Sequence, residues 1–264
     1  MKHTLSTQGR SAQAAADEPR FDSVSRAVNA IARGEFVVVV DDTDRENEGD
    51  LIIAADRITA DQMAFLVRYS SGVVCVGMEG ERLDQLELPL MVTRNSDPFR
   101  TAFTVSVDYK HGTSTGISAA DRAATLRALA NPTTQPDDLL RPGHIFPLRA
   151  RQGGVLERPG HTEAALDLAR LAGRAPAGVL CEIVNEDGSM ARRPDLFRFA
   201  REHGLLIITI ADLIIYREQL LLAQWSSKVP RWQARPLQIQ PLAAGQLAAK
   251  PVSQRLDAAV TYLG

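Results

Sequence analysis

The 264-residue chain has only two cysteines and no apolar run long enough to cross a membrane. Cys75 and Cys181 lie far apart and neither belongs to a CxxC pair, so the sequence supports neither a disulfide framework nor a cysteine zinc site. A membrane helix needs about 20 apolar residues, whereas the longest near-continuous run is 205–211. Because each cysteine lies in a Val/Ile-rich run, we expect two buried structural thiols.

An excess of charge of one sign is also missing. The chain has 30 basic and 32 acidic residues, for a net charge of −2, so nothing indicates a nucleic-acid partner. The first twenty residues lack the apolar centre of a secretory signal. We therefore expect a cytoplasmic protein without a nucleic-acid or membrane partner.

The pattern of apolar residues divides the chain into three parts. Residues 1–20 lack apolar periodicity and are predicted to be a mobile N-terminal tail. Residues 21–217 carry the periodic segments and are predicted to form a single domain. Residues 218–264 are a C-terminal extension of unknown role, in which Pro and Gln break the periodicity from Trp225 onward.

Strands and helices alternate through residues 21–217. The predicted strands are 36–40, 51–54, 72–76, 103–107, 178–184 and 205–210, and the predicted helices begin near residues 24, 59, 118, 162, 194 and 211. The alternation predicts an α+β fold: a three-layer α/β/α sandwich around one sheet. The hairpin-like segment 36–54 favours a mixed sheet over a purely parallel one.

The segment DDTDRENEGD, residues 41–50, holds six carboxylates and one arginine between two predicted strands. A solvated turn is the ordinary interpretation of such a cluster. The flanking strands, however, place the segment at a sheet edge, where α/β proteins bind ligands. Crowded carboxylates favour a divalent cation such as Mg²⁺, Mn²⁺ or Ca²⁺. An EF-hand loop is excluded, because Asn47 stands where the turn glycine is required.

A second motif, RPGHT at residues 158–162, directly precedes a predicted amphipathic helix. A structural histidine is the alternative interpretation. Arg158, a glycine turn and Thr162 at the helix N-terminus are together suited to a phosphate monoester. His161 would lie beside that anion and could bind a metal or transfer a proton.

Two further ionisable residues lie in apolar surroundings. His144 follows a Pro-Gly pair in RPGHIFPL and is expected at the start of an apolar run. Glu182 lies inside a predicted strand, where a carboxylate costs free energy unless it is paired or functional. GTSTG, residues 112–116, matches the serine-hydrolase elbow formally, but four residues separate it from the predicted strand.

Seven segments, in order, resemble the 3,4-dihydroxy-2-butanone 4-phosphate synthase family of riboflavin biosynthesis. They are DDTDRENEGDL, TAFTVSVD, GTSTGISAADR, RPGHIFPLRA, GGVLERPGHTEAALDLARLAG, PAGVLCEIVNEDGSMAR and ITIADLIIYR. The resemblance covers residues 24–217. It implies a lyase that converts D-ribulose 5-phosphate to L-3,4-dihydroxy-2-butanone 4-phosphate and formate, with Mg²⁺ or Mn²⁺, as a homodimer.

The same resemblance implies roles for individual residues. The implied metal ligands are Glu46 and His161; the substrate-binding residues are Arg45, Glu46, Asp50, Arg158 and Thr162; the catalytic residues are His144 and Glu182; Cys75 and Thr115 are secondary positions. Fused GTP cyclohydrolase II domains carry a cysteine zinc cluster, and no cysteine follows residue 217. We therefore expect a monofunctional synthase.

Two other functions stay open from the sequence. A serine hydrolase would use Ser114 as nucleophile with His161 or His203 as base, and would be indifferent to EDTA. A catalytically silent relative would bind ribulose 5-phosphate without releasing formate.

Overall fold

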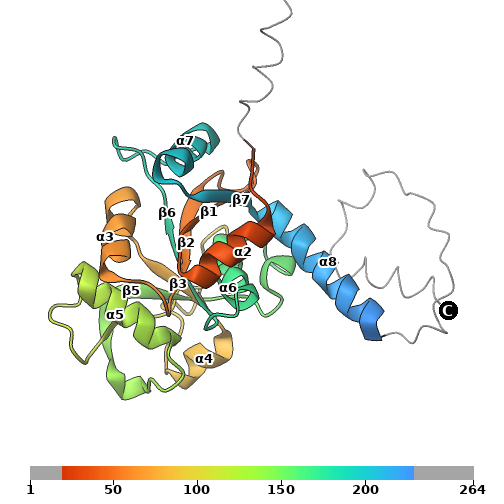
Figure 1. Cartoon of the computed structure of the whole chain (residues 1–264). Coiled ribbons are helices and arrows are strands. Elements are labelled where there is room, and N and C mark those ends of the chain that lie inside the picture. The colour runs from red at the N-terminus through yellow and green to blue at the C-terminus, as the bar shows by residue number, and fades with distance from the viewer. Residues whose placement is uncertain (1–19, 229–264) are drawn as a thin grey trace, which may run out of the picture.

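The computed structural model describes residues 20–228. Nearly all of the predicted N-terminal tail and most of the predicted extension lie outside the described residues. The described chain folds around one seven-stranded sheet with the strand order β4-β5-β3-β6-β2-β1-β7 (Figure 1). The strands are β1 (Val37–Val40), β2 (Gly49–Ala54), β3 (Cys75–Met78), β4 (Val107–Tyr109), β5 (Leu139–Arg149), β6 (Ala177–Glu182) and β7 (Leu206–Thr209).

The sheet is mixed, as predicted. Strand β1 pairs antiparallel with β2 and parallel with β7, and β2 pairs antiparallel with β6. Strand β3 lies between β6 and β5, antiparallel to the first and parallel to the second. The four valines of β1 and all six residues of β2 are buried. Such strands have no solvent-facing side, which requires helices on both faces of the sheet.

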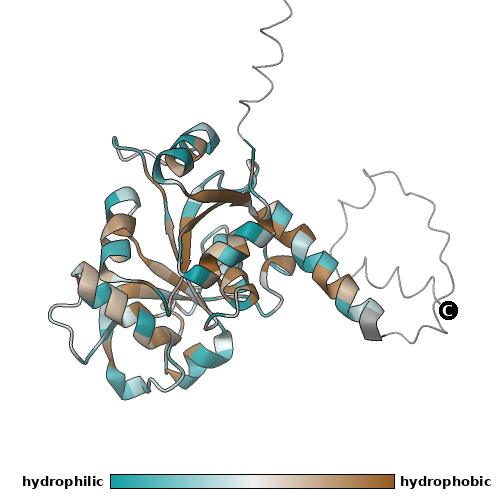
Figure 2. Ribbon diagram, viewed as in Figure 1, coloured by the Kyte–Doolittle hydropathy of each residue, from teal (hydrophilic) through white to brown (hydrophobic). Residues whose placement is uncertain are grey.

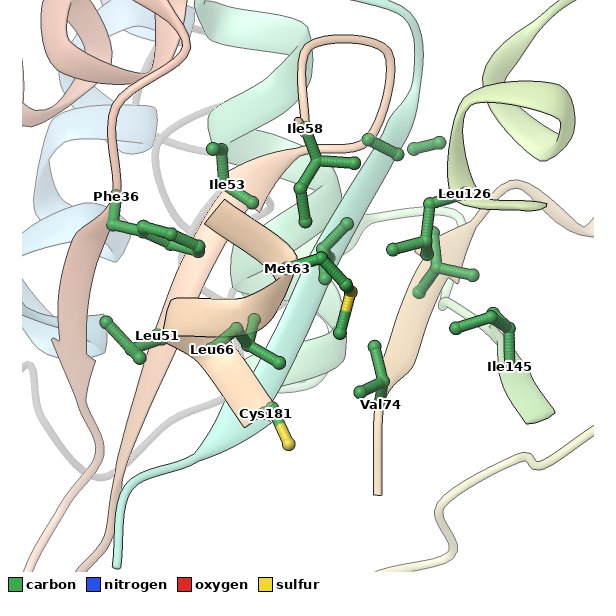
Figure 3. Close-up of a cluster of buried hydrophobic side chains, with 14 of the residues drawn as sticks. Phe36, Leu51, Ile53, Ile58, Met63, Leu66, Val74, Leu126, Ile145 and Cys181 are labelled. Atoms are coloured by element: carbon green, nitrogen blue, oxygen red, sulfur yellow. The ribbon is translucent and has the colours of Figure 1, made fainter. Parts of the chain in front are cut away.

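Two separate apolar cores lie on the two faces of the sheet. The helices are α2 (Val24–Arg33), α3 (Ala60–Tyr69), α4 (Gly80–Gln85), α5 (Ala119–Ala130), α6 (His161–Leu171), α7 (Arg193–His203) and α8 (Ile210–Lys228), with 3₁₀ turns η1 (Pro136–Asp138) and η2 (Gly154–Leu156). Met63 and Leu66 of α3 and Leu126 of α5 pack on one face (Figure 3). Apolar residues of α2, α6 and α8 pack on the other. The predicted three-layer arrangement is confirmed, and Figure 2 shows the strands as mostly hydrophobic between helices of mixed character.

The structure corrects one predicted strand. Residues 103–107 were expected to form a strand, but Phe103 and Thr104 make only isolated bridges, and β4 begins at Val107. The pairing of β4 with β5 shifts register between Val107 and Asp108. Such a bulge bends the strand and redirects side chains.

Strand β5 was not predicted, because Pro-Gly in RPGHIFPL indicates a turn. The structure holds an 11-residue strand there. Pro142 and Gly143 fall in the interval where β4 and β5 change register, so the missing N–H of proline leaves no ladder hydrogen bond unmade. A Cβ on Gly143 would lie 2.0 Å from the carbonyl carbon of Val107, so this approach requires glycine.

Helix α8 is tied to the domain by a buried carboxylate. Asp167 of α6 is fully buried, accepts the backbone N–H of Val155 at 2.9 Å and forms an ion pair with Arg217 of α8. The pair lies at the predicted boundary at residue 217, and α8 continues through it to Lys228. This carboxylate therefore joins η2, α6 and α8.

We expect Asp167→Asn to lower the free energy of unfolding by about 3 kcal/mol, because Arg217 would lose its counter-charge in a largely buried setting. Glu35→Gln is the matched control, since Glu35 pairs with Arg33 where both side chains are about half exposed and such pairs contribute at most about 1 kcal/mol. Urea unfolding of the three proteins measures both changes. Equal, small changes in the two variants would contradict the structural role of Asp167.

Candidate active site

Asp41 organises the acidic segment between β1 and β2. Its side chain is fully buried and accepts the backbone N–H groups of Glu46 at 3.0 Å and Glu48 at 2.8 Å. The guanidinium of Arg45 donates to the same carboxylate at 3.0 Å and also pairs with Glu46. The segment is therefore an ordered loop built around one carboxylate.

His161, the first residue of α6, faces this loop. Its Nε2 lies 3.1 Å from the carbonyl oxygen of Val39, which can only accept a hydrogen bond, so Nε2 carries a proton. Its Nδ1 faces two carboxylates, at 3.8 Å from Glu46 Oε2 and 3.7 Å from Asp50 Oδ1. Ligand atoms of Asp41, Glu46 and His161 all lie within 4.8 Å of one another. The Val39 carbonyl thus orients the ring with Nδ1 toward the carboxylates.

The pKa values of this corner are strongly shifted. Burial raises the pKa of Asp50 to about 8, and the positive charge of His161 only partly opposes this shift. Burial lowers the pKa of His161, but the charges of Asp50, Glu46 and Asp41 outweigh burial and raise the pKa to about 9. A proton on Nδ1 therefore adds to the positive charge of Arg45 in compensating the crowded carboxylates.

The donor set fits a divalent cation. Asp50 Oδ1 is buried without a hydrogen-bond partner within the described chain, and a buried polar oxygen without a partner is costly. Carboxylate oxygens with one imidazole nitrogen suit Mg²⁺ or Mn²⁺. A cation beside Glu46 and His161 would replace the Nδ1 proton and satisfy the same negative charge.

Glu182 lies beside the acidic corner, the cluster formed by Asp41, Glu46, Asp50 and His161. It stands directly opposite Asp50 in the register of β2 and β6, so both side chains lie on the same face. The hydroxyl of Ser71 donates to Glu182 Oε2 at 2.6 Å. The neighbouring Cys181 is buried, with its thiol donating to the carbonyl of Val73 at 3.3 Å.

Both thiols are buried, as predicted. Burial raises the pKa of Cys181 to about 11, although hydrogen bonds from serines oppose the shift. Burial also raises the pKa of Cys75 well above its ordinary value. Neither thiol is therefore a thiolate nucleophile at neutral pH.

Arg158 and Thr162 lie at the N-terminus of α6. The N-cap is Gly160, so no side chain caps the first backbone N–H groups. Arg158 pairs with Glu163 at 2.7 Å and donates to the carbonyl of Phe99 at 3.0 Å. The guanidinium of Arg45 stacks over the ring of the same Phe99, 5.0 Å from its centroid. Both predicted substrate-binding arginines thus contact one loop.

His144 lies apart from the acidic corner. It belongs to β5, which β3 separates from β6, and its Nδ1 lies 2.7 Å from Asp108 Oδ2. Sequence reasoning assigned roles to neither Asp41 nor Asp108. Asp41 lies within the identified acidic segment, and Asp108 directly follows the predicted strand 103–107. In both cases the only signal in the sequence was a carboxylate next to a predicted strand. Asp41 contacts backbone N–H groups, and Asp108 contacts His144, a residue distant in sequence; residue type reveals neither contact.

The serine-hydrolase alternative finds no support in the described part of the chain. The hydroxyl of Ser114 donates to Asp121 at 2.8 Å, and this carboxylate also accepts the N–H of Gly116 at 3.1 Å. His203 lies among aromatic rings, 4.5 Å from Phe199 between centroids. Ser114 therefore stabilises its own loop and has no histidine base in contact.

Comparison with known proteins decides the family. A sequence profile described as 3,4-dihydroxy-2-butanone 4-phosphate synthase matches residues 25–216. The chain belongs to the 3,4-dihydroxy-2-butanone 4-phosphate synthase family. The resemblance inferred from the seven sequence segments is confirmed, and the protein is an enzyme, a lyase of this family.

Several relatives of this synthase family are closely similar. The chain is 61% identical over 193 residues to the 3,4-dihydroxy-2-butanone 4-phosphate synthase of Agrobacterium fabrum, covering 73% of this chain and 91% of the relative. It is 60% identical over 199 residues to the riboflavin biosynthesis protein RibBA of Salinispora arenicola, covering 75% of this chain and only 47% of that longer protein.

Solved structures of the family share the fold. One synthase crystallised with two magnesium ions has a TM-score of 0.73 at 51% identity, covering 75% of this chain and 98% of the other. A cation-free synthase structure has a TM-score of 0.71 at 48% identity, covering 76% of this chain and 99% of the other.

Within residues 20–228, no helix is both long and apolar enough to span a bilayer.

We expect cation binding to displace the Nδ1 proton of His161, so that calorimetry at pH 7 in two buffers of different ionisation enthalpy shows release of at least one proton per Mn²⁺. The affinity should rise from pH 7 to pH 9, because the unbound site is protonated below the raised pKa of His161, about 9.

Matched variants test the ligand assignment. Glu46→Gln and His161→Ala should each weaken Mn²⁺ binding by more than about 100-fold, since even outer-shell changes cost up to that much. Asp44→Asn removes the same charge from an exposed position of the same loop and should change the affinity by less than about threefold. Proton release of zero, or equal losses in all three variants, would contradict the assignment.

Proposed function

We propose that this chain converts D-ribulose 5-phosphate to L-3,4-dihydroxy-2-butanone 4-phosphate and formate, using Mg²⁺ or Mn²⁺. The observation that carries the proposal is the convergence of Asp41, Glu46 and His161 within 4.8 Å in a buried acidic corner. A relative of the same fold was crystallised with two magnesium ions. A ketose phosphate must first lose a proton beside its carbonyl, and the resulting enediolate needs positive charge close to its oxygens.

Glu46 and His161 are the proposed protein ligands of the cation, which when bound supplies Lewis-acid stabilisation of negative charge on the substrate oxygens. Two protein ligands leave positions for substrate and water. Asp50 presents its buried Oδ1 to the same space. Its raised pKa suits a carboxyl group that accepts or donates a proton near neutral pH.

His144 and Glu182 are the proposed catalytic residues. The His144 side chain is 41% exposed, so its ring is accessible, and an imidazole can transfer protons in both directions at neutral pH. Glu182 is held by the Ser71 hydroxyl beside Asp50. We propose that these groups serve the dehydration, rearrangement and formate-release steps.

The phosphate group is proposed to bind at the N-terminus of α6. Uncapped N–H groups after Gly160 favour an anion, and Arg158, Thr162 and Arg45 supply charge and hydrogen bonds. Arg158 is held by Glu163 and the Phe99 carbonyl, so phosphate binding would exchange these partners. Binding far from the reacting carbons orients them.

A homodimer is proposed on a second observation. Several large apolar side chains are about half exposed: Leu90, Met91, Val92, Ile117 and Leu140. Exposed apolar groups of this size mark interaction surfaces when they gather. Cytoplasmic location, a synthase domain at 21–217 and flanking segments at 1–20 and 218–264 remain our proposals.

The decisive assay incubates the full chain with ribulose 5-phosphate and Mg²⁺ or EDTA and follows formate and the four-carbon product by NMR. We expect both products in equal amounts with Mg²⁺ and neither with EDTA. Binding without formate release would support the silent-relative alternative instead.

Variant turnover separates binding from chemistry. Glu46→Gln and His161→Ala should abolish metal-dependent turnover while leaving the fold intact. His144→Ala should retain substrate affinity and lose turnover by about 10²- to 10⁴-fold, the usual contribution of general acid–base catalysis. Weakened affinity with unchanged turnover in His144→Ala would contradict the assigned role.

A further inference from the structure

Asp108 holds His144 through two contacts from one carboxylate. Its Oδ1 accepts the backbone N–H of His144 at 2.8 Å, and its Oδ2 lies 2.7 Å from the ring Nδ1. Asp108 is buried, and it stands at the register shift between β4 and β5. The bulge therefore turns this side chain toward the neighbouring strand.

The surroundings are shaped to this carboxylate. A Cβ on Gly116 would lie 1.9 Å from Asp108 Oδ2, so the loop closes over the carboxylate only with glycine at this position. Gly116 has a φ of +85°, which also favours glycine. The buried guanidinium of Arg122 interacts electrostatically with Asp108. Loop, bulge and charge together hold this one side chain in one place.

The two contacts determine which nitrogen of His144 carries the proton. A backbone N–H can only donate, and an ionised carboxylate can only accept. Nδ1 must therefore donate to Oδ2, which leaves the lone pair on Nε2. The His144 side chain is 41% exposed whereas that of Asp108 is 9% exposed, so the ring rather than the carboxylate is accessible.

We propose that Asp108 is a positioning residue that fixes His144 as the Nδ1–H tautomer, with Nε2 as the atom that exchanges protons with the substrate. This inference rests on the proposed catalytic role of His144. When Nε2 accepts a proton, the ring becomes an imidazolium and the adjacent carboxylate stabilises its charge. The proton moves between substrate and Nε2 alone, and Asp108 stays ionised throughout.

Asp108→Asn gives a sharp test because its orientation is imposed by the backbone. The amide carbonyl must accept the N–H of His144, so the NH₂ group takes the place of Oδ2 and faces Nδ1. We expect ¹⁵N NMR of histidine-labelled protein to show Nδ1–H in the wild type and Nε2–H in the variant. The kcat should fall by about 10²- to 10⁴-fold, with KM changed by less than about threefold.

The chain provides a matched control in a second histidine–carboxylate pair. His111 Nε2 lies 2.8 Å from Asp138 Oδ1, and the His111 side chain is 55% exposed. Asp138 also accepts a backbone N–H at 2.8 Å, but from Gln135 and not from the histidine it contacts. The control pair therefore matches the ring contact, and neither of its residues is a proposed site residue. Asp138→Asn should leave kcat within about twofold of the wild type, as is usual for surface changes.

Asp108→Glu keeps two acceptor oxygens and should retain the Nδ1–H tautomer with a kcat above that of Asp108→Asn. Wild-type His144 in the Nε2–H form, or a tautomer change in Asp108→Asn without loss of kcat, would overturn the proposal. The wild-type spectrum decides the tautomer even if a variant fails to fold. Full turnover in His144→Ala would instead contradict the proposed catalytic role of His144 on which this inference rests, whereas an inactive His144→Ala beside a fully active Asp108→Asn overturns only the role of Asp108. Absence of formate from the wild type would contradict the proposed function itself.

Discussion

The buried negative charge at the end of β1 is the constraint on which the site depends. Asp41, Glu46, Glu48 and Asp50 share one corner with the imidazole of His161 and the guanidinium of Arg45. Burial raises the pKa of Glu48, and the charge of Glu46 adds to the shift. Such a cluster persists only if positive charge compensates it. The same position between Glu46 and Asp50 suits a proton on Nδ1 or a divalent cation, which is why we propose this corner as the cation site.

Because side chains alternate between the two faces of the sheet, the site carboxylates of β2 and β6 lie on one face and their apolar neighbours on the other. Asp50 and Glu182 stand opposite each other and face the layer that contains α6. Their neighbours Leu51 and Cys181 are also opposite each other, and both belong to the other core. A one-residue shift of β2 would exchange the two sets. The register of β2 is therefore a requirement of the site as well as of the fold.

Local sequence pattern predicted the elements whose signal lies within the segment itself. The run of valines predicted β1, the capping residues Thr59 and Gln62 predicted the start of α3, and both elements form as expected. Strand β5 escaped prediction because the Pro142-Gly143 pair is tolerated only where β4 changes register, a property of the partner strand. The strand expected at 103–107 failed for the related reason that its apolar residues pair with β5 only at isolated points.

The site, like the fold, was predictable only where the signal lies within one segment. Residue type and motif singled out the acidic segment, His161 and Glu182, and the family resemblance implied roles for Glu46 and Asp50 within that segment. The structure brings these four side chains close together. The partners that orient them were beyond the reach of the sequence: the Val39 carbonyl behind His161, the backbone N–H groups on Asp41, and Asp108 beside His144. Each is a contact between segments or with main-chain atoms, which residue type does not reveal.

The most direct measurement of the cation site is the electron spin-echo envelope modulation of Mn²⁺ bound to the full chain. We expect modulation from one directly coordinated histidine nitrogen, which changes when histidine is labelled with ¹⁵N and disappears in His161→Ala. Bound Mn²⁺ without nitrogen modulation, or modulation that persists in His161→Ala, would show that the cation does not occupy the position between Glu46 and His161.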